Sequence, residues 1–267
     1  AVVCAIIERW QELYRQWAQR RIEQRFVYIW VDGIYSRVRT TDDRPCMLVV
    51  IGCDEQGEKH ILGVVDGERE SELSWMAMLT DLKRRGLQAP RLAIGDGALG
   101  FWAAVSKVFP STLHQGCTVH ALRNAIDKVP KKLQELLKKM VQAVFMAETK
   151  HDALEAFAQF KTTFGDKYPK AVETIERRLD SLLAFYGFPA AHWKSIRSTN
   201  VIESTFATIR RRSKQTNGHA SREAAIAMMY VLAVNAKKTW RRLDGFDHIS
   251  NVLKGITYHD GLLKMAA

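Results

Sequence analysis

The chain of 267 residues is 47% hydrophobic and 26% charged, with a net charge of +11, a composition typical of a globular protein with a large core. It contains neither an apolar run of about 18 residues nor a signal-peptide pattern, which argues against a membrane-spanning or exported protein. Its four cysteines are scattered along the sequence, which favours free thiols in a reducing cytoplasm over a disulfide framework.

The chain opens with a predicted helix. Residues 5–24 carry apolar side chains at helical spacing with charged residues between them. Because the first residue is not Met and the chain begins within this pattern, we expect residues 1–24 to be a lead-in helix, the tail of a missing N-terminal region.

The next hundred residues predict a mixed sheet. Five strand-like runs rich in β-branched or apolar residues lie at 25–33, 46–53, 60–67, 91–97 and 112–117. Helical patterns lie at 70–86, 99–109 and 118–127. Ser71 is suited to cap the first of these helices and Gly86 to end it. The first strand is expected to end at the turn pair Asp32-Gly33. The order predicts an α/β core with a mixed five-stranded sheet and helices on its faces, at residues 25–128.

Strand patterns stop near Val129. Residues 129–194 contain helical patterns separated by proline and glycine, and they predict an all-helical block. Helical patterns return at 198–214 and 221–243, so residues 195–267 are expected to complete the core.

Residues 95–100 have the spacing G-x-G-x-x-G of a dinucleotide-binding turn. In dinucleotide-binding folds this turn follows the first strand, and an acid about 20 residues later binds the ribose. Here the turn follows the fourth strand, and residues 114–120 contain no acid. We therefore expect no nucleotide cofactor and interpret the glycines as presenting Asp96.

Three acids are candidates for a metal site. Asp32 and Asp96 each follow an apolar strand and precede glycine, and strand-end side chains line the functional crevice of an open α/β sheet. Two carboxylates that meet there repel each other unless a cation lies between them. For either residue alone, ordinary Asp-Gly turn chemistry is the alternative. On a helix beginning near Asn200, Glu203 lies at the rim of the apolar stripe and could face the sheet. The spacing of Asn200 and Glu203 fits a capping box equally well.

Most of the positive charge lies in one stretch. Residues 191–242 contain eleven Lys or Arg and two acids, an excess of 11 − 2 = +9. Such a basic surface attracts polyanions and points to nucleic acid. The alternative is a solvated helical face that keeps the protein soluble.

Four blocks, VDGIYSRVR, AIGDGALGFW, CTVHALRN and STNVIESTFATIRRRSKQTNG, resemble in order those of Mutator-related bacterial insertion-sequence transposases. The resemblance covers about residues 28–240 and implies a ribonuclease-H-like core in which Asp32, Asp96 and Glu203 form the DDE triad. It implies that residues 129–194 are an all-α insertion domain and that the acids hold two Mg²⁺ or Mn²⁺ ions, with Asp32 shared between the ions. The expected activity is cleavage of DNA strands at element ends and transfer of the 3′-OH to target DNA.

The resemblance also implies a homodimer on paired ends, at the nucleoid of the bacterial cytoplasm. Family members carry an N-terminal region that binds the element ends, and we do not expect that region in this chain.

Further residues are candidates for DNA contact. Cys117 and His120 form a C-x-x-H pair, which resembles a family element beside the active site. A buried thiol with a capping histidine is the structural alternative, and half of a zinc site is the weaker one. Trp193 is interpreted first as a packing anchor and second as a base-stacking residue. The other candidates are Arg123, Lys194, Arg197, Asn200, Arg210, Arg211, Arg212 and Lys214.

Two other functions fit the same residues. A hydrolytic nuclease of the same fold would cut DNA without joining strands. A non-catalytic DNA-binding protein derived from a transposase would do neither, although an intact triad argues against it.

Overall fold

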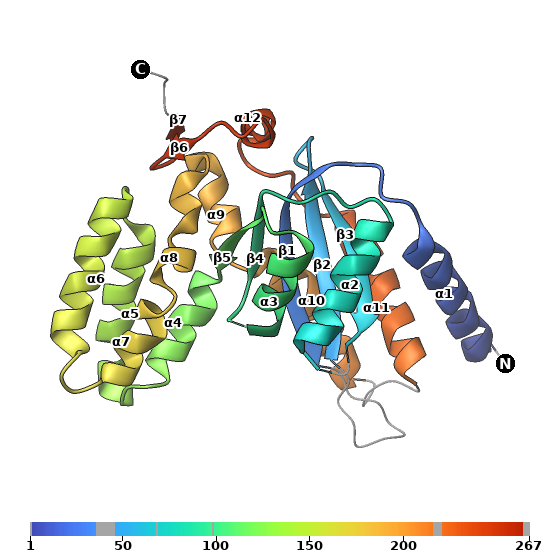
Figure 1. Cartoon of the computed structure of the whole chain (residues 1–267). Coiled ribbons are helices and arrows are strands. Elements are labelled where there is room, and N and C mark those ends of the chain that lie inside the picture. Colours follow the sequence, from blue (N-terminus) through green and yellow to red (C-terminus); the bar gives the residue numbers. More distant parts are fainter. Residues whose placement is uncertain (1, 36–45, 68, 98, 216–220, 264–267) are drawn as a thin grey trace.

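The computed structural model describes residues 2–35, 46–67, 69–97, 99–215 and 221–263 (Figure 1). One five-stranded sheet has the order β3-β2-β1-β4-β5, and β6 and β7 form a separate two-stranded ribbon. The strands are β1 (Phe26–Tyr35), β2 (Cys46–Asp54), β3 (Lys59–Asp66), β4 (Leu92–Gly95), β5 (Leu113–Gly116), β6 (Tyr258–His259) and β7 (Leu262–Leu263). β1 is antiparallel to β2 and parallel to β4, and β5 is parallel to β4. The expected mixed five-stranded sheet is confirmed.

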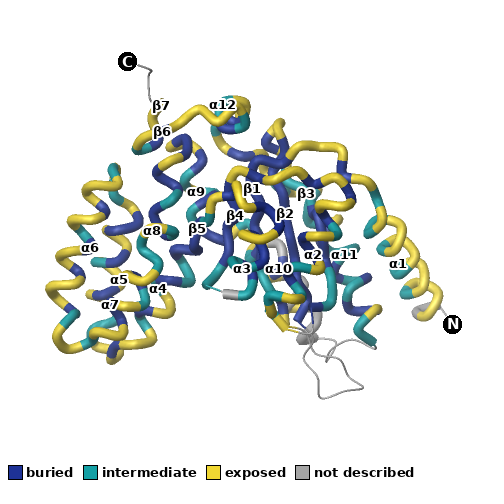
Figure 2. Tube along the Cα trace, viewed as in Figure 1, coloured by how far each residue is buried: buried dark blue, intermediate teal, exposed yellow. Residues whose placement is uncertain are grey.

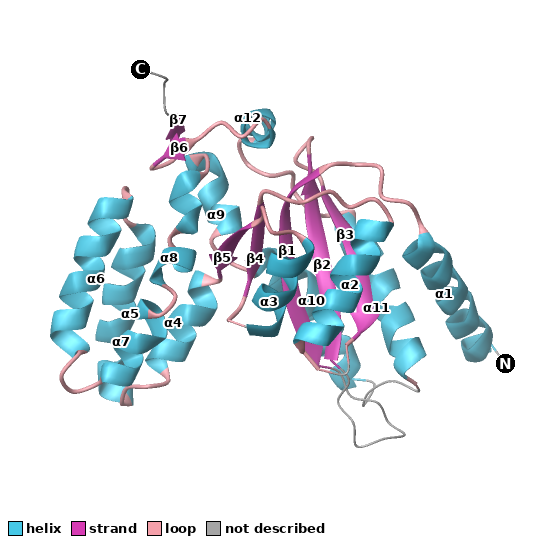
Figure 3. Cartoon of the chain, viewed as in Figure 1, coloured by secondary structure: helices cyan, strands magenta, loops and turns pink. Residues whose placement is uncertain are grey.

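The helices lie around this sheet and beyond one of its edges (Figure 3). They are α1 (Val2–Gln19), α2 (Glu72–Arg84), α3 (Leu99–Val108), α4 (Thr118–Ile126), α5 (Lys131–Met146), α6 (Lys150–Phe164), α7 (Pro169–Glu176), α8 (Leu179–Leu182), α9 (Trp193–Ile196), α10 (Asn200–Gln215), α11 (Arg222–Lys237) and α12 (Ile249–Leu253).

Both faces of the sheet are covered, which explains why β2 is buried along its whole length. Side chains alternate along β1. Ile29 and Val31 enter the core beneath α2 and α3 with Trp75, whereas Tyr28 and Trp30 enter the core on the opposite face, beneath α10 and α11.

The first strand is longer than expected. β1 continues through Asp32-Gly33 to Tyr35, because β2 pairs with it throughout, with Val49 opposite Asp32 and Leu48 opposite Gly33. The prediction of a turn at Asp32-Gly33 is therefore wrong, and the acid lies within the strand near its carboxyl end.

The ends of α2 are as expected. The Ser71 side chain accepts a hydrogen bond of 3.2 Å from the backbone N–H of Ser74 at the N-terminus. Gly86 follows the helix with φ +117°, a conformation that a side chain would strain.

The described structure from residue 129 to residue 194 contains helices and turns, as predicted for this helical block. The block lies beyond β5 and packs through α5 and α7 against α4 (Figure 1). Buried Gln115 joins it to the sheet, since its Nε2 donates to the Leu182 carbonyl at 2.9 Å and its Oε1 accepts from the Phe185 N–H at 2.7 Å. Whether the block is an insertion in a ribonuclease-H-like fold stays a prediction.

The N-terminal helix α1 packs on the outside of α11 and near β3. The Tyr14 hydroxyl donates to the Val64 carbonyl at 2.7 Å, and the rings of Trp17 and Tyr230 lie 4.6 Å apart. The rest of α1 is mostly exposed (Figure 2). Among the described helices, none combines the length and the apolar character that a membrane span requires.

Candidate active site

Two of the predicted acids lie at the carboxyl ends of adjacent parallel strands. Trp30 of β1 lies opposite Ile94 of β4, and Asp96 directly follows β4. Continuing this register by two residues sets Asp32 beside Asp96, and period-two alternation sends both side chains to the face of the sheet that carries Trp30. Cys117 follows β5, the third parallel strand, at the same edge.

Glu203 comes to this edge from α10, far away in sequence. Ile202 and Phe206 are fully buried against the sheet and anchor the start of the helix. Glu203 is at the rim of that apolar stripe, as predicted, and its side chain is 24% exposed. Its Oε1 accepts a hydrogen bond of 3.3 Å from the Thr199 hydroxyl.

The capping-box alternative does not hold as stated. A capping box would need Asn200 to be the residue that precedes the helix. α10 begins at Asn200, so the residue that precedes it is Thr199. The Glu203 carboxylate contacts the Thr199 hydroxyl and faces across the site toward α4. This contact leaves Glu203 in place as a candidate for the third acid.

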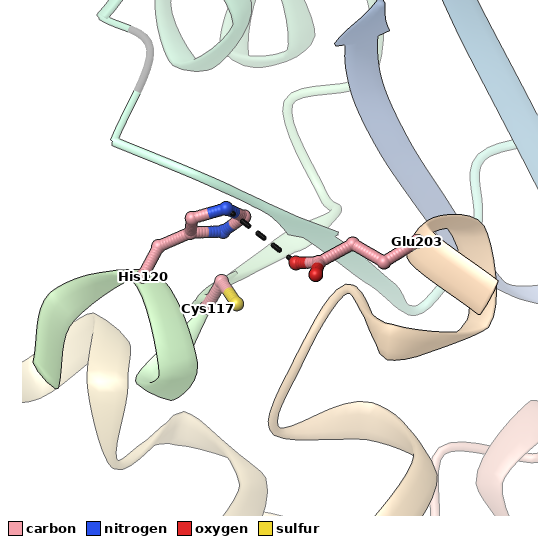
Figure 4. A group of neighbouring side chains, drawn as sticks. All are labelled: Cys117, His120 and Glu203. Atoms are coloured by element: carbon pink, nitrogen blue, oxygen red, sulfur yellow. Dashed lines mark ion pairs between the residues drawn. The ribbon is translucent and has the colours of Figure 1, made fainter. Parts of the chain in front are cut away.

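His120 lies between Asp96 and Glu203. Its Nδ1 is 4.0 Å from Asp96 Oδ2. Its Nε2 is 3.4 Å from Glu203 Oε1 (Figure 4). The hydrogen bond with Cys117, joined by the charges of Cys117, Asp96 and Glu203, outweighs burial and raises the pKa of His120 to about 9. When it carries a proton on each nitrogen, His120 compensates the two carboxylates.

Cys117 is fully buried beside this imidazole. Burial acts to raise the pKa of its thiol, but hydrogen bonds with His120 and Thr199 outweigh burial, and the net effect is a lowered pKa. The Thr199 backbone N–H donates to the sulfur at 3.4 Å, and the Thr199 hydroxyl, whose one proton is within reach of both the sulfur and Glu203 Oε1, lies 3.3 Å from each. The sulfur, one His120 nitrogen and one Glu203 oxygen all lie within 4.8 Å of one another.

Sequence reasoning missed a fourth acid, Glu70. Its carboxylate lies against Gly33, where a Cβ atom would overlap it, and Cys46 Sγ is 4.0 Å from its Oε1. Burial first, and then the negative charge of Asp96, raises the pKa of Glu70. Glu70 precedes α2 in a charged turn, and no sequence pattern distinguishes it from ordinary surface acids.

The glycines around Asp96 have a packing role. A Cβ atom at Gly97 would overlap the guanidinium of Arg178, and one at Gly116 would lie 3.0 Å from Arg178 Nη2. A Cβ atom at Gly100 would lie 2.6 Å from the backbone nitrogen of Glu72. The G-x-G-x-x-G spacing thus reflects close approach of neighbouring chain segments to the turn that carries Asp96.

Arg178 was also missed, and it comes from the helical block. Its Nη1 lies 4.0 Å from Asp96 Oδ1, while its Nη2 is buried without a hydrogen-bond partner among the described residues. A pocket of about 330 Å³ opens beside it, lined in part by Gly97, Trp102 and His114. The helical block therefore contributes a cation to the surroundings of Asp96.

Trp193 and Arg197 pack inside the protein. The Trp193 ring lies 4.8 Å from the Tyr186 ring, and its indole N–H donates to the Phe188 carbonyl at 2.9 Å. These contacts lie within the helical block, so an anchoring of the block on the core by Trp193 stays a prediction. Arg197 Nη1 donates to the Phe145 carbonyl at 3.3 Å, and burial lowers the pKa of its guanidinium.

The other DNA-contact candidates are divided between the surface and the undescribed part of the chain. Arg123, Lys194, Asn200 and Arg211 are exposed. The side chains of Arg210, Arg212 and Lys214 lie outside the described residues, although α10 continues through these positions.

The donor set fits hard divalent cations. Asp32, Asp96 and Glu203 offer carboxylate oxygens, the ligands that Mg²⁺ and Mn²⁺ prefer. His120 lies between two of these acids, 4.0 and 3.4 Å from their oxygens, at a place where positive charge offsets carboxylate repulsion. The fold and the site together define an α/β protein with an acidic centre at the carboxyl ends of parallel strands.

Comparison with known proteins gives the family. The family model described as Transposase, Mutator family, matches residues 1–243. The transposase for insertion sequence element IS6120 of Mycolicibacterium smegmatis is 42% identical over 264 residues, which are 98% of this chain and 82% of the relative. The transposase for IST2 of Acidithiobacillus ferrooxidans is 39% identical over 265 residues, 98% of this chain and 89% of the relative. The chain belongs to the Mutator family of transposases, as the four sequence blocks predicted.

Proposed function

We propose that this chain is a DDE-type DNA transposase that cuts strands at element ends and joins the freed 3′-OH to target DNA. One observation carries the proposal: Asp96, after a core strand, and Glu203, on a distant helix, approach the same imidazole. The register of β1 and β4 adds Asp32 to this pair. The strand order β3-β2-β1-β4-β5, with three antiparallel strands followed by two parallel ones, supports a ribonuclease-H-like core.

Asp32, Asp96 and Glu203 would hold two Mg²⁺ or Mn²⁺ ions. When bound, such ions would supply Lewis-acid chemistry for activation of the attacking hydroxyl and stabilisation of the leaving oxygen. Asp32 and Asp96 provide ligands on a rigid sheet, and the buried side chains of Ile202 and Phe206 fix the third ligand on α10. His120 keeps Asp96 and Glu203 close together in the absence of cations, because its positive charge offsets their repulsion.

The proposed partner is DNA, both element ends and target. The net charge of +11 and the exposed cations Arg123, Lys194 and Arg211 support a polyanionic partner. Relatives described as transposases for insertion sequence elements support the same substrate class. We also propose a homodimer on paired ends and action at the bacterial nucleoid.

The test uses DNA duplexes that carry the terminal repeats flanking this gene, with Mg²⁺ or Mn²⁺. We expect Asp32→Asn, Asp96→Asn and Glu203→Gln each to reduce strand cleavage at least about 1,000-fold, equivalent to about 4 kcal/mol of transition-state stabilisation. DNA affinity should remain near that of the parent chain. Glu72→Gln is a matched control, since Glu72 pairs with Lys107 on the surface.

The products distinguish the alternatives. Cleavage followed by joining supports a transposase, and cleavage alone indicates a hydrolytic nuclease. DNA binding without cleavage by the parent chain indicates a non-catalytic DNA-binding protein. Normal cleavage by any one of the three acid variants would remove that residue from the proposed centre.

A further inference from the structure

The acidic centre contains a second set of metal ligands of a different chemical kind. We propose that Cys117, His120 and Glu203 form a site for one transition-metal ion of the zinc class. We further propose that this ion inhibits the enzyme, because it takes Glu203 from the hard-cation site. The inhibition rests on the proposed function, whereas the binding does not.

The donor set carries the first step of the argument. The Cys117 sulfur, one His120 nitrogen and one Glu203 oxygen lie within 4.8 Å of one another (Figure 4). Among the described residues, these three form the group of possible metal ligands that lie this close together. Sulfur and nitrogen ligands select zinc-class ions over Mg²⁺. The C-x-x-H spacing alone offered only two ligands, and the fold supplies the third from a residue 83 positions beyond His120.

The distances are close to those of a tetrahedral site. With bonds of about 2.0 to 2.3 Å, tetrahedral donors lie about 3.5 Å apart. His120 Nε2 and Glu203 Oε1 are already 3.4 Å apart. Because every pair lies within 4.8 Å, no separation has to shorten by more than about 1.3 Å, and the partly exposed Glu203 side chain has room to rotate. A tetrahedral ion with three protein ligands would take water as its fourth ligand.

The surroundings of the sulfur carry the second step. The Thr199 backbone N–H donates to Sγ at 3.4 Å, and the Thr199 hydroxyl lies 3.3 Å from Sγ. A backbone N–H donor on a buried sulfur stabilises a thiolate, the form that binds metal, and hydrogen bonds of this kind orient metal ligands. Cys53 shows the contrast, since its thiol is buried in β2 and donates to the Asp54 carbonyl at 3.7 Å.

The two ligand-bearing helices are held together before any ion binds. The backbone N–H and the hydroxyl of Thr118 donate to the Arg197 carbonyl at 3.0 and 2.9 Å. These bonds join the start of α4 to the segment that precedes α10. When the ion binds, the Cys117–His120 pair releases the proton it shares to the buffer, and no electrons are transferred, because Zn²⁺ has no redox chemistry.

The experiment titrates the full, chelator-stripped chain with Co²⁺, which reports thiolate ligation by its absorption spectrum, and then adds Zn²⁺ to displace it. We expect one Co²⁺ per chain with a thiolate charge-transfer band and the visible bands of tetrahedral geometry. Cys117→Ser should lose the band and weaken binding at least about 100-fold, whereas Cys53→Ser should keep both. Thr199→Val keeps all three ligands and should weaken binding about tenfold.

The inhibition has its own readout. Zn²⁺ equimolar with the chain should suppress Mn²⁺-dependent cleavage in the parent chain and in Cys53→Ser, and Cys117→Ser should resist this suppression. Circular dichroism checks that each variant folds. If Cys117→Ser does not fold, Cys117→Ala takes its place in both measurements. A parent chain without a thiolate band, or a band unchanged in the folded Cys117 variant, overturns the metal site. Failure of the proposed function would show separately, as normal cleavage by Asp96→Asn.

Discussion

Two regions of the molecule each present one cation to Asp96. The core supplies His120 from α4, 4.0 Å from Oδ2, and the helical block supplies Arg178, 4.0 Å from Oδ1. His120 also contacts Glu203, and a neutral imidazole can bind a metal ion, whereas a guanidinium has no lone pair to offer one. The core cation can therefore yield to a metal ion, while the cation of the helical block is a permanent neighbour of the acid.

The difference assigns separate roles to the regions. His120 belongs to the group of side chains that changes its charge when cations bind. Arg178 lies over Gly97 and Gly116, whose missing side chains make room for it, and it links the helical block to the turn that carries Asp96. The core would hold the chemistry, and the helical block would set the position of one acid.

The largest effect that tests this comparison is expected from His120→Asn. Without the imidazolium, Asp96 and Glu203 repel each other, so we expect cleavage to fall about 10- to 100-fold and half-maximal cleavage to need more Mn²⁺. Initial rates over a range of Mn²⁺ concentrations measure both. His114→Asn is the control, because His114 stacks on Trp102 away from Glu203. An unchanged rate and metal dependence in His120→Asn would contradict the role given to the core cation.

A smaller effect, about tenfold on cleavage, is expected from Arg178→Gln. Arg178→Lys should restore little, because a lysine cannot reproduce the planar guanidinium over the two glycines. Gly116→Ala should resemble Arg178→Gln while leaving the net charge unchanged, since the new Cβ atom crowds Nη2. Arg177→Gln is the matched control, because the exposed Arg177 pairs with Glu173 on the surface. Equal rates for the Arg177 and Arg178 variants would mean that the helical block does not position Asp96.

Glu70→Gln should lower cleavage by a few-fold only. Glu70 lies against Gly33 and shares the electrostatic surroundings of Asp96, but it is not at the end of a strand. Removal of the Glu70 charge has two opposite effects: it reduces repulsion of Asp96, and it removes negative charge that attracts cations. We therefore expect only a small change in the Mn²⁺ concentration needed for cleavage. A loss as large as that of Asp96→Asn would instead make Glu70 a fourth ligand of the centre.

The smallest effect concerns stability and the joint between the two regions. His192 is buried. Its Nδ1 lies 2.7 Å from the Tyr28 hydroxyl oxygen of β1, and its Nε2 donates to the Gly245 carbonyl at 2.8 Å. Burial lowers the pKa of His192 below its ordinary value of 6.5. The unfolded chain thus binds this proton more readily, so the stability that neutral His192 contributes is complete above pH 6.5 and declines as the pH falls below it.

His192→Gln tests this joint. We expect it to lower the free energy of unfolding by about 1 kcal/mol at pH 7, and the difference from the parent chain should narrow toward pH 5. Chemical denaturation at the two pH values measures it. A difference that is constant with pH would contradict a neutral, buried His192.

Much of the architecture could be predicted from the sequence because it depends on local patterns. Apolar and β-branched runs identified the five strands, helical spacing identified the helical block, and Ser71 and Gly86 marked the ends of α2. The end of β1 could not be predicted, because Asp32-Gly33 is a good turn locally and only pairing with β2 keeps it extended. Pairing between strands is a tertiary contact that overrides local preference.

The candidate site also has one part that the sequence predicts and one part that depends on tertiary contacts. The sequence by itself determined that Asp32 and Asp96 come at or near the ends of core strands, because apolar runs and glycines are visible locally. Only the tertiary structure decided that His120 meets both Asp96 and Glu203, that Glu70 lies against Gly33, and that Arg178 occupies the space above Gly97. These contacts join residues that no periodicity relates, and they form because burial of the cores on both faces of the sheet fixes where each helix begins.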